Sequence, residues 1–327
     1  MAQNPIRENL TTLHDHLSSK PELRQGPGDL GGVLGTIALA CKSIANKVRR
    51  ARVEDVLGQV GDTNVQGEQQ EKLDVISDDL LIHCLSQRSD VAVVASEEQE
   101  KPVVLRTASE GGAFCVLFDP LDGSSNINVA VGVGTIFSVL RNEESDDDTA
   151  KAVLQPGSSQ VASGYVLYGS SVLMVLTTGS GVDMYVLDPV LGDFVLVEEG
   201  LRMPDTKKIY SLNEAYRKAF PQGYNDYLEF THTNGYAARY VGSMVADVHR
   251  TLIKGGVFLY PPTEANPEGK LRLMYEANPI GFVVEQAGGK CTTGSGRMLD
   301  VTPNQIHQRT PVILGSTGEV DAVERHL

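Results

Sequence analysis

The chain has 327 residues, a length that suits two domains of ordinary size or one large α/β unit. Hydrophobic residues make up 41% of it and charged residues 21%, as in proteins that fold around an apolar core. Its 42 acidic residues outnumber its 28 basic ones, which gives a formal net charge of −14. That balance argues against nucleic acid or an anionic membrane as a partner, because both need a basic surface. A small anionic ligand stays open, since a bound cation can reverse the field locally.

Targeting signals are sparse in the sequence. The uncharged residues 161–182 contain too many glycines, serines and tyrosines for a membrane span, and paired buried strands explain them better. The first ten residues carry Glu8 and no apolar core, so we expect no signal peptide. The ending Arg325-His326-Leu327 only loosely matches a peroxisomal tripeptide, because its first residue is not small. We expect a cytoplasmic location, with a peroxisome-like organelle as the alternative, and reduced thiols at Cys41, Cys84, Cys115 and Cys291.

The first predicted elements are helices. Residues 1–25 are polar, and we expect them to form a flexible N-terminal segment. Apolar residues at helical spacing predict one helix over residues 34–50 and a second over residues 72–86. Asp74 and Asp78 lie four residues apart on the second helix. The glycine-rich, polar residues 58–71 between the two helices are typical of a long loop.

Strands dominate the middle of the chain. Apolar runs predict strands over residues 91–95, 114–118, 129–140, 161–168, 171–178, 182–188 and 193–198. Beyond residue 200 the pattern alternates, with strands over 209–212, 257–260 and 312–314 and helices over 213–220, 244–253, 273–287 and 320–326. We therefore expect a mixed α/β (α+β) fold in two α/β halves, residues 26–200 and residues 201–327.

Two of the predicted strands end in pairs of acids. Glu97 and Glu98 follow the strand at 91–95, while Asp119 and Asp122 end the strand at 114–118. Strand ends of a common sheet are where α/β proteins bind ligands. Four carboxylates in one place repel each other unless cations lie between them, and oxygen ligands suit Mg²⁺ or Mn²⁺ rather than Zn²⁺. For Glu97 and Glu98 alone, solvated loop acids are the alternative interpretation.

The segment Asp119-Pro-Leu-Asp122-Gly-Ser-Ser is more specific than a plain turn. Pro120 constrains the turn, so that both Asp side chains can converge on one point, where the Leu121 carbonyl can join them. Gly123 admits a close backbone approach, and Ser124 and Ser125 offer N–H and hydroxyl donors to a phosphate. A metal site beside an anion cradle predicts metal-assisted hydrolysis of a phosphate ester.

Further motifs give the chain a family resemblance. They are GDTNV (61–65), KLDV (72–75), VGTIF (133–137), YSLNE (210–214), ARYVGSMVADVHR (238–250), GKLRL (269–273), YEANP (275–279) and IHQR (306–309). With Glu97-Glu98 and the Asp119 motif, they make residues 26–315 resemble the fructose-1,6-bisphosphatase class I family. That family belongs to the lithium-sensitive, Mg²⁺-dependent sugar phosphatases. The resemblance implies a layered sugar-phosphatase fold and a sugar bisphosphatase activity.

The resemblance also implies roles for single residues. It assigns metal binding, to Mg²⁺ or Mn²⁺, to Glu97, Asp119, the Leu121 carbonyl, Asp122 and Glu276. It assigns activation of the attacking water to Asp74 and Glu98, although a helix N-terminal acid is the plain alternative for Asp74. Glu68 stands where the family has an Asp on a catalytic loop, which keeps the charge on a longer side chain.

Substrate contacts follow from the same motifs. The resemblance places Gly123, Ser124 and Ser125 at the reacting phosphate, and it assigns the sugar and the second phosphate to Asn213, Tyr216, Tyr240, Met244, Tyr260 and Lys270. Core or interface packing is the alternative for the tyrosines. Arg239 matches an arginine that family members extend into a neighbouring subunit, so we expect a homo-oligomer, a tetramer or a dimer.

The substrate itself has two candidates. Fructose 1,6-bisphosphate fits the motifs best, with hydrolysis of its 1-phosphate. Residues 221–235 are shorter than the family leads us to expect, and they precede Arg239 and Tyr240, so sedoheptulose 1,7-bisphosphate stays an alternative. A silent metabolite sensor and an inositol phosphatase fit less well, because the metal-binding carboxylates and the Lys270 motif are present.

Many family members are inhibited by AMP at the start of their first long helix. The equivalent turn here is Gly26-Pro-Gly-Asp-Leu-Gly31, in which Pro27 and Gly31 replace hydroxyl residues. A Lys-Tyr pair of the family is Ala113-Phe114 in this chain. The contacts that would hold the AMP phosphate are therefore missing, and we predict no inhibition by AMP.

Overall fold

The computed structural model describes residues 10–63, 69–143 and 146–327, and its main feature is an eight-stranded sheet. The strand order is β10 (Asp193–Glu198), β9 (Asp183–Asp188), β8 (Val172–Thr177), β7 (Ala162–Tyr168), β6 (Val133–Arg141), β5 (Phe114–Asp122), β3 (Val91–Ser96) and β4 (Val103–Val104). Neighbouring strands are antiparallel except β3 and β5, which are parallel. Every residue of β3 and β5 is buried, as their unbroken apolar runs predict.

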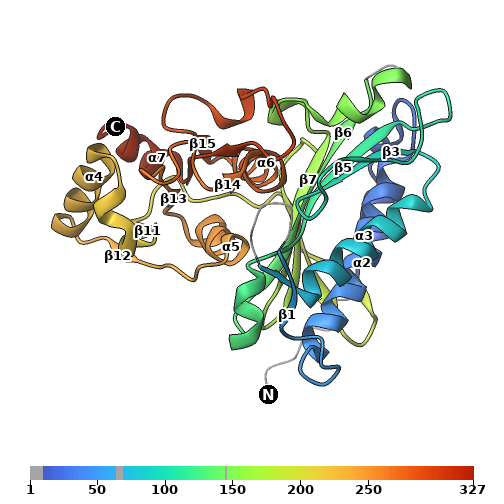
Figure 1. Cartoon of the computed structure of the whole chain (residues 1–327), viewed down its shortest axis with the longest axis horizontal. Helices are drawn as coiled ribbons and strands as arrows, with labels where there is room; N and C mark the ends of the chain where they lie inside the picture. The colour runs from blue at the N-terminus through green and yellow to red at the C-terminus, as the bar shows by residue number, and fades with distance from the viewer. Residues whose placement is uncertain (1–9, 64–68, 144–145) are drawn as a thin grey trace.

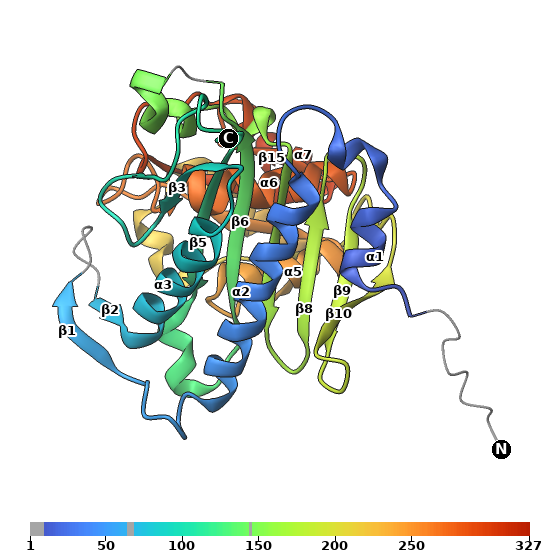
Figure 2. The same ribbon diagram turned by 90° about the vertical axis from the view of Figure 1, so that its right-hand side faces the viewer.

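Helices cover both faces of this sheet. Figure 2 shows α2 (Leu30–Arg50) and α3 (Lys72–Ser86) lying across one face, with α1 (Leu13–Ser18) beside them. The opposite face packs on α5 (Met244–Lys254) and α6 (Asn278–Gln286). Its core joins Ile136 and Tyr165 of the sheet to Val248 and Ile280 of these helices.

A second sheet of five strands completes the layers. Its order is β12 (Ala237–Ala238), β11 (Ile209–Ser211), β13 (Val257–Tyr260), β17 (Val312–Gly315) and β15 (Lys290–Thr292). Phe258 and Leu314 point toward α5 and α6, whereas Leu259 and Ile313 pack with α4 (Gln222–Thr233) and α7 (Thr317–Glu324). Because side chains alternate between the two faces of a strand, each sheet packs against helices on both faces. The result is five layers: α2 and α3, the large sheet, α5 and α6, the second sheet, and α4 with α7 (Figure 1).

Short elements fill the connections. Two small antiparallel pairs join β1 (Gln59–Thr63) to β2 (Gln69–Glu71) and β14 (Leu271–Arg272) to β16 (Arg309–Thr310). A π-helix, η6 (Leu273–Ala277), leads directly into α6. The 3₁₀ turns are η1 (Pro21–Arg24), η2 (Ser124–Val129), η3 (Asp146–Val153), η4 (Gly157–Ser159), η5 (Glu214–Ala219) and η7 (Met298–Asp300).

The mixed α/β fold class is confirmed, and several local expectations change. Within the N-terminal segment, residues 13–24 form α1 and η1, and Leu13, Leu17 and Leu23 bury their side chains against the first core. The expected loop at 58–71 contains the β1–β2 pair, which polar sequence did not reveal. The expected helix at 273–287 is divided into η6 and α6, with Pro279 in the first turn of α6.

The four cysteines are free, and three of them are buried. Cys41, Cys115 and Cys291 are buried, Cys84 is partly exposed, and all four are free of disulfides. Burial raises the pKa of the Cys41 and Cys115 thiols to about 12, which keeps them protonated and unreactive. Within the residues that the structure describes, no helix is both long and apolar enough to cross a membrane.

Candidate active site

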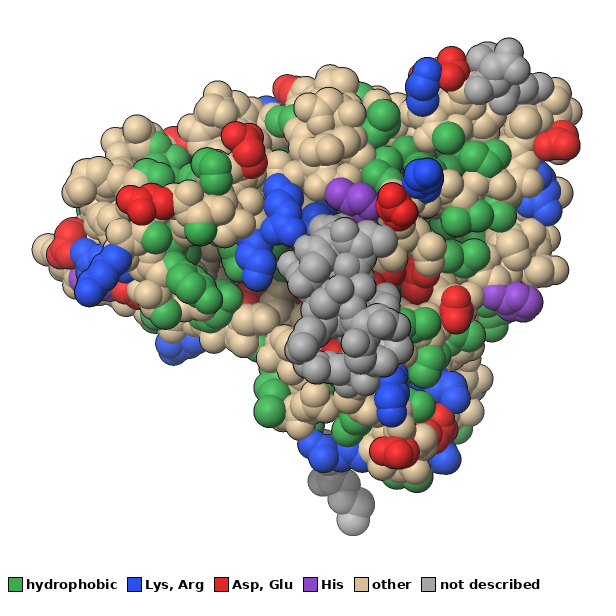
Figure 3. All heavy atoms as spheres, viewed as in Figure 1, with side chains coloured by type: hydrophobic (Ala, Val, Ile, Leu, Met, Phe, Trp, Pro, Cys, Tyr) green, Lys and Arg blue, Asp and Glu red, His purple; other side chains and the backbone are tan. Residues whose placement is uncertain are grey.

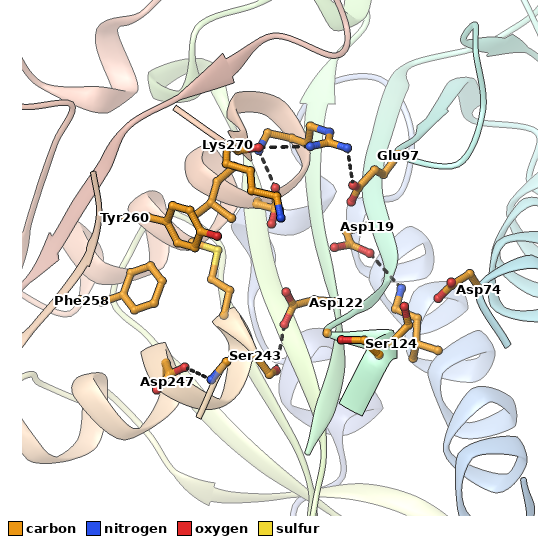
Figure 4. Close-up of a pocket in the computed structure, with 18 of the residues that line it drawn as sticks. Asp74, Glu97, Asp119, Asp122, Ser124, Ser243, Asp247, Phe258, Tyr260 and Lys270 are labelled. Atoms are coloured by element: carbon orange, nitrogen blue, oxygen red, sulfur yellow. Dashed lines mark hydrogen bonds and ion pairs between the residues drawn. The ribbon is translucent and has the colours of Figure 1, made fainter. Parts of the chain in front are cut away.

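A pocket of about 350 Å³ lies where the ends of β3 and β5 meet the C-terminal elements. Figure 4 shows the acids of β5 on one side of the pocket and Tyr260 and Lys270 on another. Basic and acidic side chains also lie close together near the middle of the face seen in Figure 3. The pocket therefore combines an acidic wall with a basic one.

Three buried acids form the centre of the acidic wall. Asp119 and Asp122 end β5, and Glu276 comes from the π-helix η6, about 150 residues later in the chain. One carboxylate oxygen from each lies within 4.8 Å of the others. Glu97 joins them because β3 is parallel to β5, and its N–H donates to the Phe118 carbonyl at 3.1 Å. The structure therefore places the four acids that end the two predicted strands, Glu97, Glu98, Asp119 and Asp122, around one pocket together with Glu276.

Burial and mutual repulsion oppose the ionisation of these acids. Burial raises the pKa of Asp119 well above its ordinary value, and the nearby carboxylates of Glu97, Asp122 and Glu276 raise it further. Burial and Glu97 likewise raise the pKa of Glu276. One guanidinium, that of Arg272, lies 3.3 Å from Glu97. Clustered carboxylate oxygens with raised pKa values fit a hard divalent cation, which would let all of them ionise.

The Asp119–Asp122 turn is fixed by bonds that leave oxygens for a cation. The Leu121 N–H donates to Asp119 Oδ1 at 2.9 Å, and the Thr135 hydroxyl donates to the Pro120 carbonyl at 2.8 Å. Asp122 Oδ2 accepts hydrogen bonds from Ser243 Oγ at 3.0 Å and from the Val245 N–H at 2.9 Å. These bonds lower the pKa of Asp122, but burial outweighs them and raises it to about 6.

Gly123 starts the anion cradle that the sequence predicts. Its φ of 75° lies in the left-handed region, and a Cβ atom there would meet Ser243 Cβ at 2.9 Å. Glycine is therefore needed both for the turn and for the close contact with the C-terminal part. Ser124 and Ser125 follow in η2, and both line the pocket.

Asp74 faces the same pocket from the first turn of α3. Its carboxylate accepts the Glu71 N–H at 2.9 Å, in a reciprocal capping box at the start of the helix. Burial raises the pKa of Asp74 to about 7, although the Glu71 N–H and a hydrogen bond with Ser124 act in the opposite direction. A carboxyl with that pKa exchanges protons at neutral pH.

Most of the predicted substrate residues lie around the pocket. Tyr240, Met244, Tyr260 and Lys270 line it. Asn213 and Tyr216 are outside this lining but lie close enough to Tyr240 to influence its pKa. Arg239 points to solvent and donates to the Ala238 carbonyl, while Glu68 lies outside the described residues.

The structure adds residues that sequence reasoning missed. Arg272 reaches the acidic cluster, and its guanidinium also donates to the Lys270 carbonyl at 3.1 Å. Asp247 lines the pocket and accepts the N–H groups of Val241 and Gly242 at 2.8 and 2.9 Å. Both residues stand inside motifs singled out above, but a charged residue in a motif does not reveal which neighbour it will contact.

Comparison with known proteins identifies the family. The model of the N-terminal domain of fructose-1,6-bisphosphatase matches residues 11–199, and that of its C-terminal domain matches residues 203–327. The chain belongs to the fructose-1,6-bisphosphatase family.

Relatives and a solved structure of this family agree over nearly the whole length. The chain is 46% identical to a class 1 fructose-1,6-bisphosphatase of Chlorobium chlorochromatii, covering 97% of both chains. It is 45% identical to isozyme 2 of Bos taurus, covering 97% of this chain and 95% of the relative. The holo structure of the Leishmania major fructose-1,6-bisphosphatase superposes with a TM-score of 0.91 at 39% identity, covering 97% and 99% of the two chains.

Proposed function

We propose that the chain hydrolyses the 1-phosphate of fructose 1,6-bisphosphate and releases fructose 6-phosphate and inorganic phosphate. The single observation that carries this proposal is the pocket itself. It has three buried carboxylates within 4.8 Å of one another at one wall and Lys270 at another. Such a site suits a substrate with two phosphates, one bound through a cation and one through a lysine. The names of the Chlorobium and Bos relatives support the same substrate.

The acidic wall would hold the divalent cation, Mg²⁺ or Mn²⁺. Glu97, Asp119, the Leu121 carbonyl, Asp122 and Glu276 would be its ligands, and four of these five are carboxylates that repel one another in its absence. The bound cation supplies charge neutralisation for the phosphoryl oxygens and activates water as a nucleophile.

The chain's own residues then position the reactants. The N–H groups and hydroxyls of Ser124 and Ser125 would bind the oxygens of the reacting phosphate at the start of η2. Asp74 and Glu98 line the pocket beside them. With a pKa of about 7, Asp74 would accept a proton from the attacking water and release it again at neutral pH.

The opposite wall would recognise the remote phosphate and the sugar. Lys270 supplies a positive charge, and the Tyr240 and Tyr260 hydroxyls donate hydrogen bonds without adding charge. Burial raises the pKa of the Tyr240 hydroxyl, so it stays a donor throughout the working pH range. Asn213 and Tyr216 would complete this wall from beside Tyr240.

The test is an assay of phosphate release from two sugars in parallel. Fructose 1,6-bisphosphate should give the higher kcat/KM with Mg²⁺, and excess EDTA should abolish turnover. A higher kcat/KM with sedoheptulose 1,7-bisphosphate would replace the proposed substrate by the longer ketose. Failure to hydrolyse either sugar would reject the bisphosphatase assignment.

We further propose a homo-oligomer in which Arg239 completes the site of a neighbouring subunit. Its side chain points to solvent in the single chain and does not line the pocket of its own subunit. The inactive variants Asp119→Ala and Arg239→Ala should therefore regain activity when they are mixed and allowed to exchange subunits. No gain on mixing would mean that Arg239 acts within its own chain.

The buried, free thiols also favour a reducing, cytosolic compartment.

A further inference from the structure

Asp78 is a buried acid that the proposed chemistry does not use. It lies one helical turn after Asp74 on α3, is 2% exposed, and is absent from the pocket lining. Among the described residues it forms no ion pair with Lys or Arg, and burial raises its pKa. A buried carboxylate without a cation is unfavourable unless hydrogen bonds hold it. Its partners therefore indicate what it does.

Two residues near Asp78 flank the Glu97–Glu98 turn. Gln99 Nε2 donates to Asp78 Oδ2 at 2.5 Å. Ser96, which is 1% exposed, lies close enough to the same carboxyl group to lower its pKa, but Asp78 Oδ1 accepts no hydrogen bond from the described residues. Ser96 Oγ also accepts the Glu98 N–H at 3.2 Å. We call Asp78, Ser96 and Gln99 together the Asp78 bracket.

The C-terminal part of the chain contacts the same turn from the other side. His307 Nε2 lies 3.0 Å from the Gln99 carbonyl, and only a protonated nitrogen can donate to a carbonyl, so Nε2 carries the hydrogen. The ring of His307 packs on Tyr275 at a centroid distance of 5.6 Å, and Tyr275 precedes Glu276 in η6. The Glu97–Glu98 turn thus contacts α3 through Gln99 and Asp78, and it contacts the segment that carries Glu276 through His307 and Tyr275.

We propose that Asp78 is a positioning residue that holds Glu97 and Glu98 at the site through its hydrogen bond with Gln99. The inference rests on the proposed function, because the roles of Glu97 and Glu98 belong to it. The physical need is repulsion: Glu97 raises the pKa of Asp119 and of Glu276, which means that the three carboxylates oppose one another. The Asp78 bracket keeps the turn in place against that repulsion from the interior side of α3. Displacement of a reacting group by about 1 Å can lower a rate by about 100-fold.

A charge change followed by its compensation tests the proposal. In Gln99→Glu two carboxylates face each other at the bracket, and we expect kcat to fall at least about tenfold and the affinity for Mn²⁺ to weaken at least about tenfold. The double variant Asp78→Asn/Gln99→Glu reverses the polarity of the bond, since the Asn amide N–H₂ donates to the Glu carboxylate. We expect it to regain kcat and Mn²⁺ affinity to within about threefold of the parent. The KM for fructose 1,6-bisphosphate should change little in either.

Binding of Mn²⁺ to the substrate-free protein, followed by electron paramagnetic resonance, makes the test independent of turnover. It therefore decides the inference even if the parent fails to hydrolyse the sugar, which would reject the proposed function alone. Asp79→Asn removes an exposed charge from the adjacent position and serves as the matched control. If Gln99→Glu does not fold, Gln99→Met removes the donor without adding charge, and it should weaken Mn²⁺ binding in the same direction. Normal Mn²⁺ binding in both single variants, or no recovery in a folded double variant, would overturn the proposal.

Discussion

The two carboxylate oxygens of Asp122 have different surroundings. Oδ2 accepts two hydrogen bonds from Ser243 and Val245, which leaves Oδ1 for a cation. Asp122→Asn can keep the acceptor for these donors, but its amide then turns an N–H₂ group toward the cation. We expect the variant to fold and to lose at least about 100-fold in kcat at saturating Mg²⁺. Steady-state assays with a thermal unfolding curve measure both. Ser243→Ala is the control, with a smaller loss, and near-normal turnover of Asp122→Asn would remove Asp122 from the ligands.

Lys270 is expected to bind a phosphate that does not react. Binding to the remote phosphate is about the same in the substrate and in the transition state, so its loss changes KM more than kcat. For Lys270→Met we expect KM to rise roughly ten- to a hundredfold, the size of a lost charged hydrogen bond, with kcat within a few-fold. Lys254→Met removes an equal charge at the end of α5 and should leave both constants unchanged. A fall in kcat with an unchanged KM would contradict this role.

At the residue scale, local chain geometry predicts the contiguous part of the site, whereas distant members such as Glu276 and Lys270 were expected only from the family resemblance. Asp119, Leu121 and Asp122 stand in one short motif, so their convergence follows from local chain geometry. Arg272 was missed because it contacts Glu97, which lies 175 positions away in the chain. No local sequence pattern predicts a contact between residues so far apart. Asp247 was missed because its role is to accept backbone N–H groups, which all sequences offer equally.

At the scale of elements, the hydrophobic pattern predicted the long strands, including β10 at an edge of the large sheet, and missed short ones such as β4 and the β1–β2 pair. The strands β3, β5 and β6 are buried along nearly their whole length, so apolar runs mark them clearly. The β1–β2 pair has a polar sequence, and such a pair depends on hydrogen bonds that any residue can make. The helix α4 was missed because its apolar face, Tyr224, Tyr227 and Leu228, is short and interrupted.

The start of α2 supports the expectation that AMP does not inhibit. The Asp29 N–H already donates to Asp90 Oδ2 at 2.9 Å, and Pro27 has no N–H to offer. The Asp29 and Asp90 carboxylates would repel a phosphate at this helix N-terminus, and the Arg141 guanidinium is held at the carbonyls of Pro27 and Gln25. The pocket beside it, of about 600 Å³, is lined by Asp29 as well.

We therefore predict that AMP at about 1 mM leaves the rate essentially unchanged at saturating Mg²⁺, since each lost charged contact weakens binding roughly ten- to a hundredfold. Initial rates across an AMP titration measure it, with inorganic phosphate as a control for inhibition at the active site. A midpoint in the low micromolar range would show that the nucleotide binds through other residues.

At the scale of the whole molecule, the acidic pocket makes stability depend on pH and on the cation together. The folded state raises the pKa of Asp74 to about 7 and that of Asp122 to about 6, both above the ordinary value of 3.8. Between the ordinary pKa of 3.8 and these raised values, the folded protein binds more protons than the unfolded one. The metal-free protein therefore loses stability as pH rises from about 4 to about 7. A bound cation takes the place of the proton on Asp122, which is one of its proposed ligands.

We expect the stabilisation by Mg²⁺ to be larger at pH 8 than at pH 5.5, by about 2 kcal/mol or more, because each unit of pKa shift corresponds to about 1.4 kcal/mol. Urea unfolding with Mg²⁺ and with EDTA at both pH values measures this difference. Subtracting the EDTA series from the Mg²⁺ series removes the contribution to stability of groups away from the pocket. One such group is His249, whose pKa is lowered by burial to about 4. Equal stabilisation at both pH values would show that the cation does not replace protons on these acids.

The bonds from Ser243 and Val245 to Asp122 also link the large sheet to the first turn of α5. Any rotation of α5 that breaks them frees Oδ2 and alters the oxygen donors available to the cation. Cation affinity and the orientation of the C-terminal layers are thus coupled through a single side chain. Suppose that a second molecule binds one orientation of these layers more tightly than another. By thermodynamic reciprocity, it changes the affinity for the cation by the same factor by which the cation changes the affinity for that molecule. A ligand that rotated α5 would therefore change the cation affinity without contacting the phosphate.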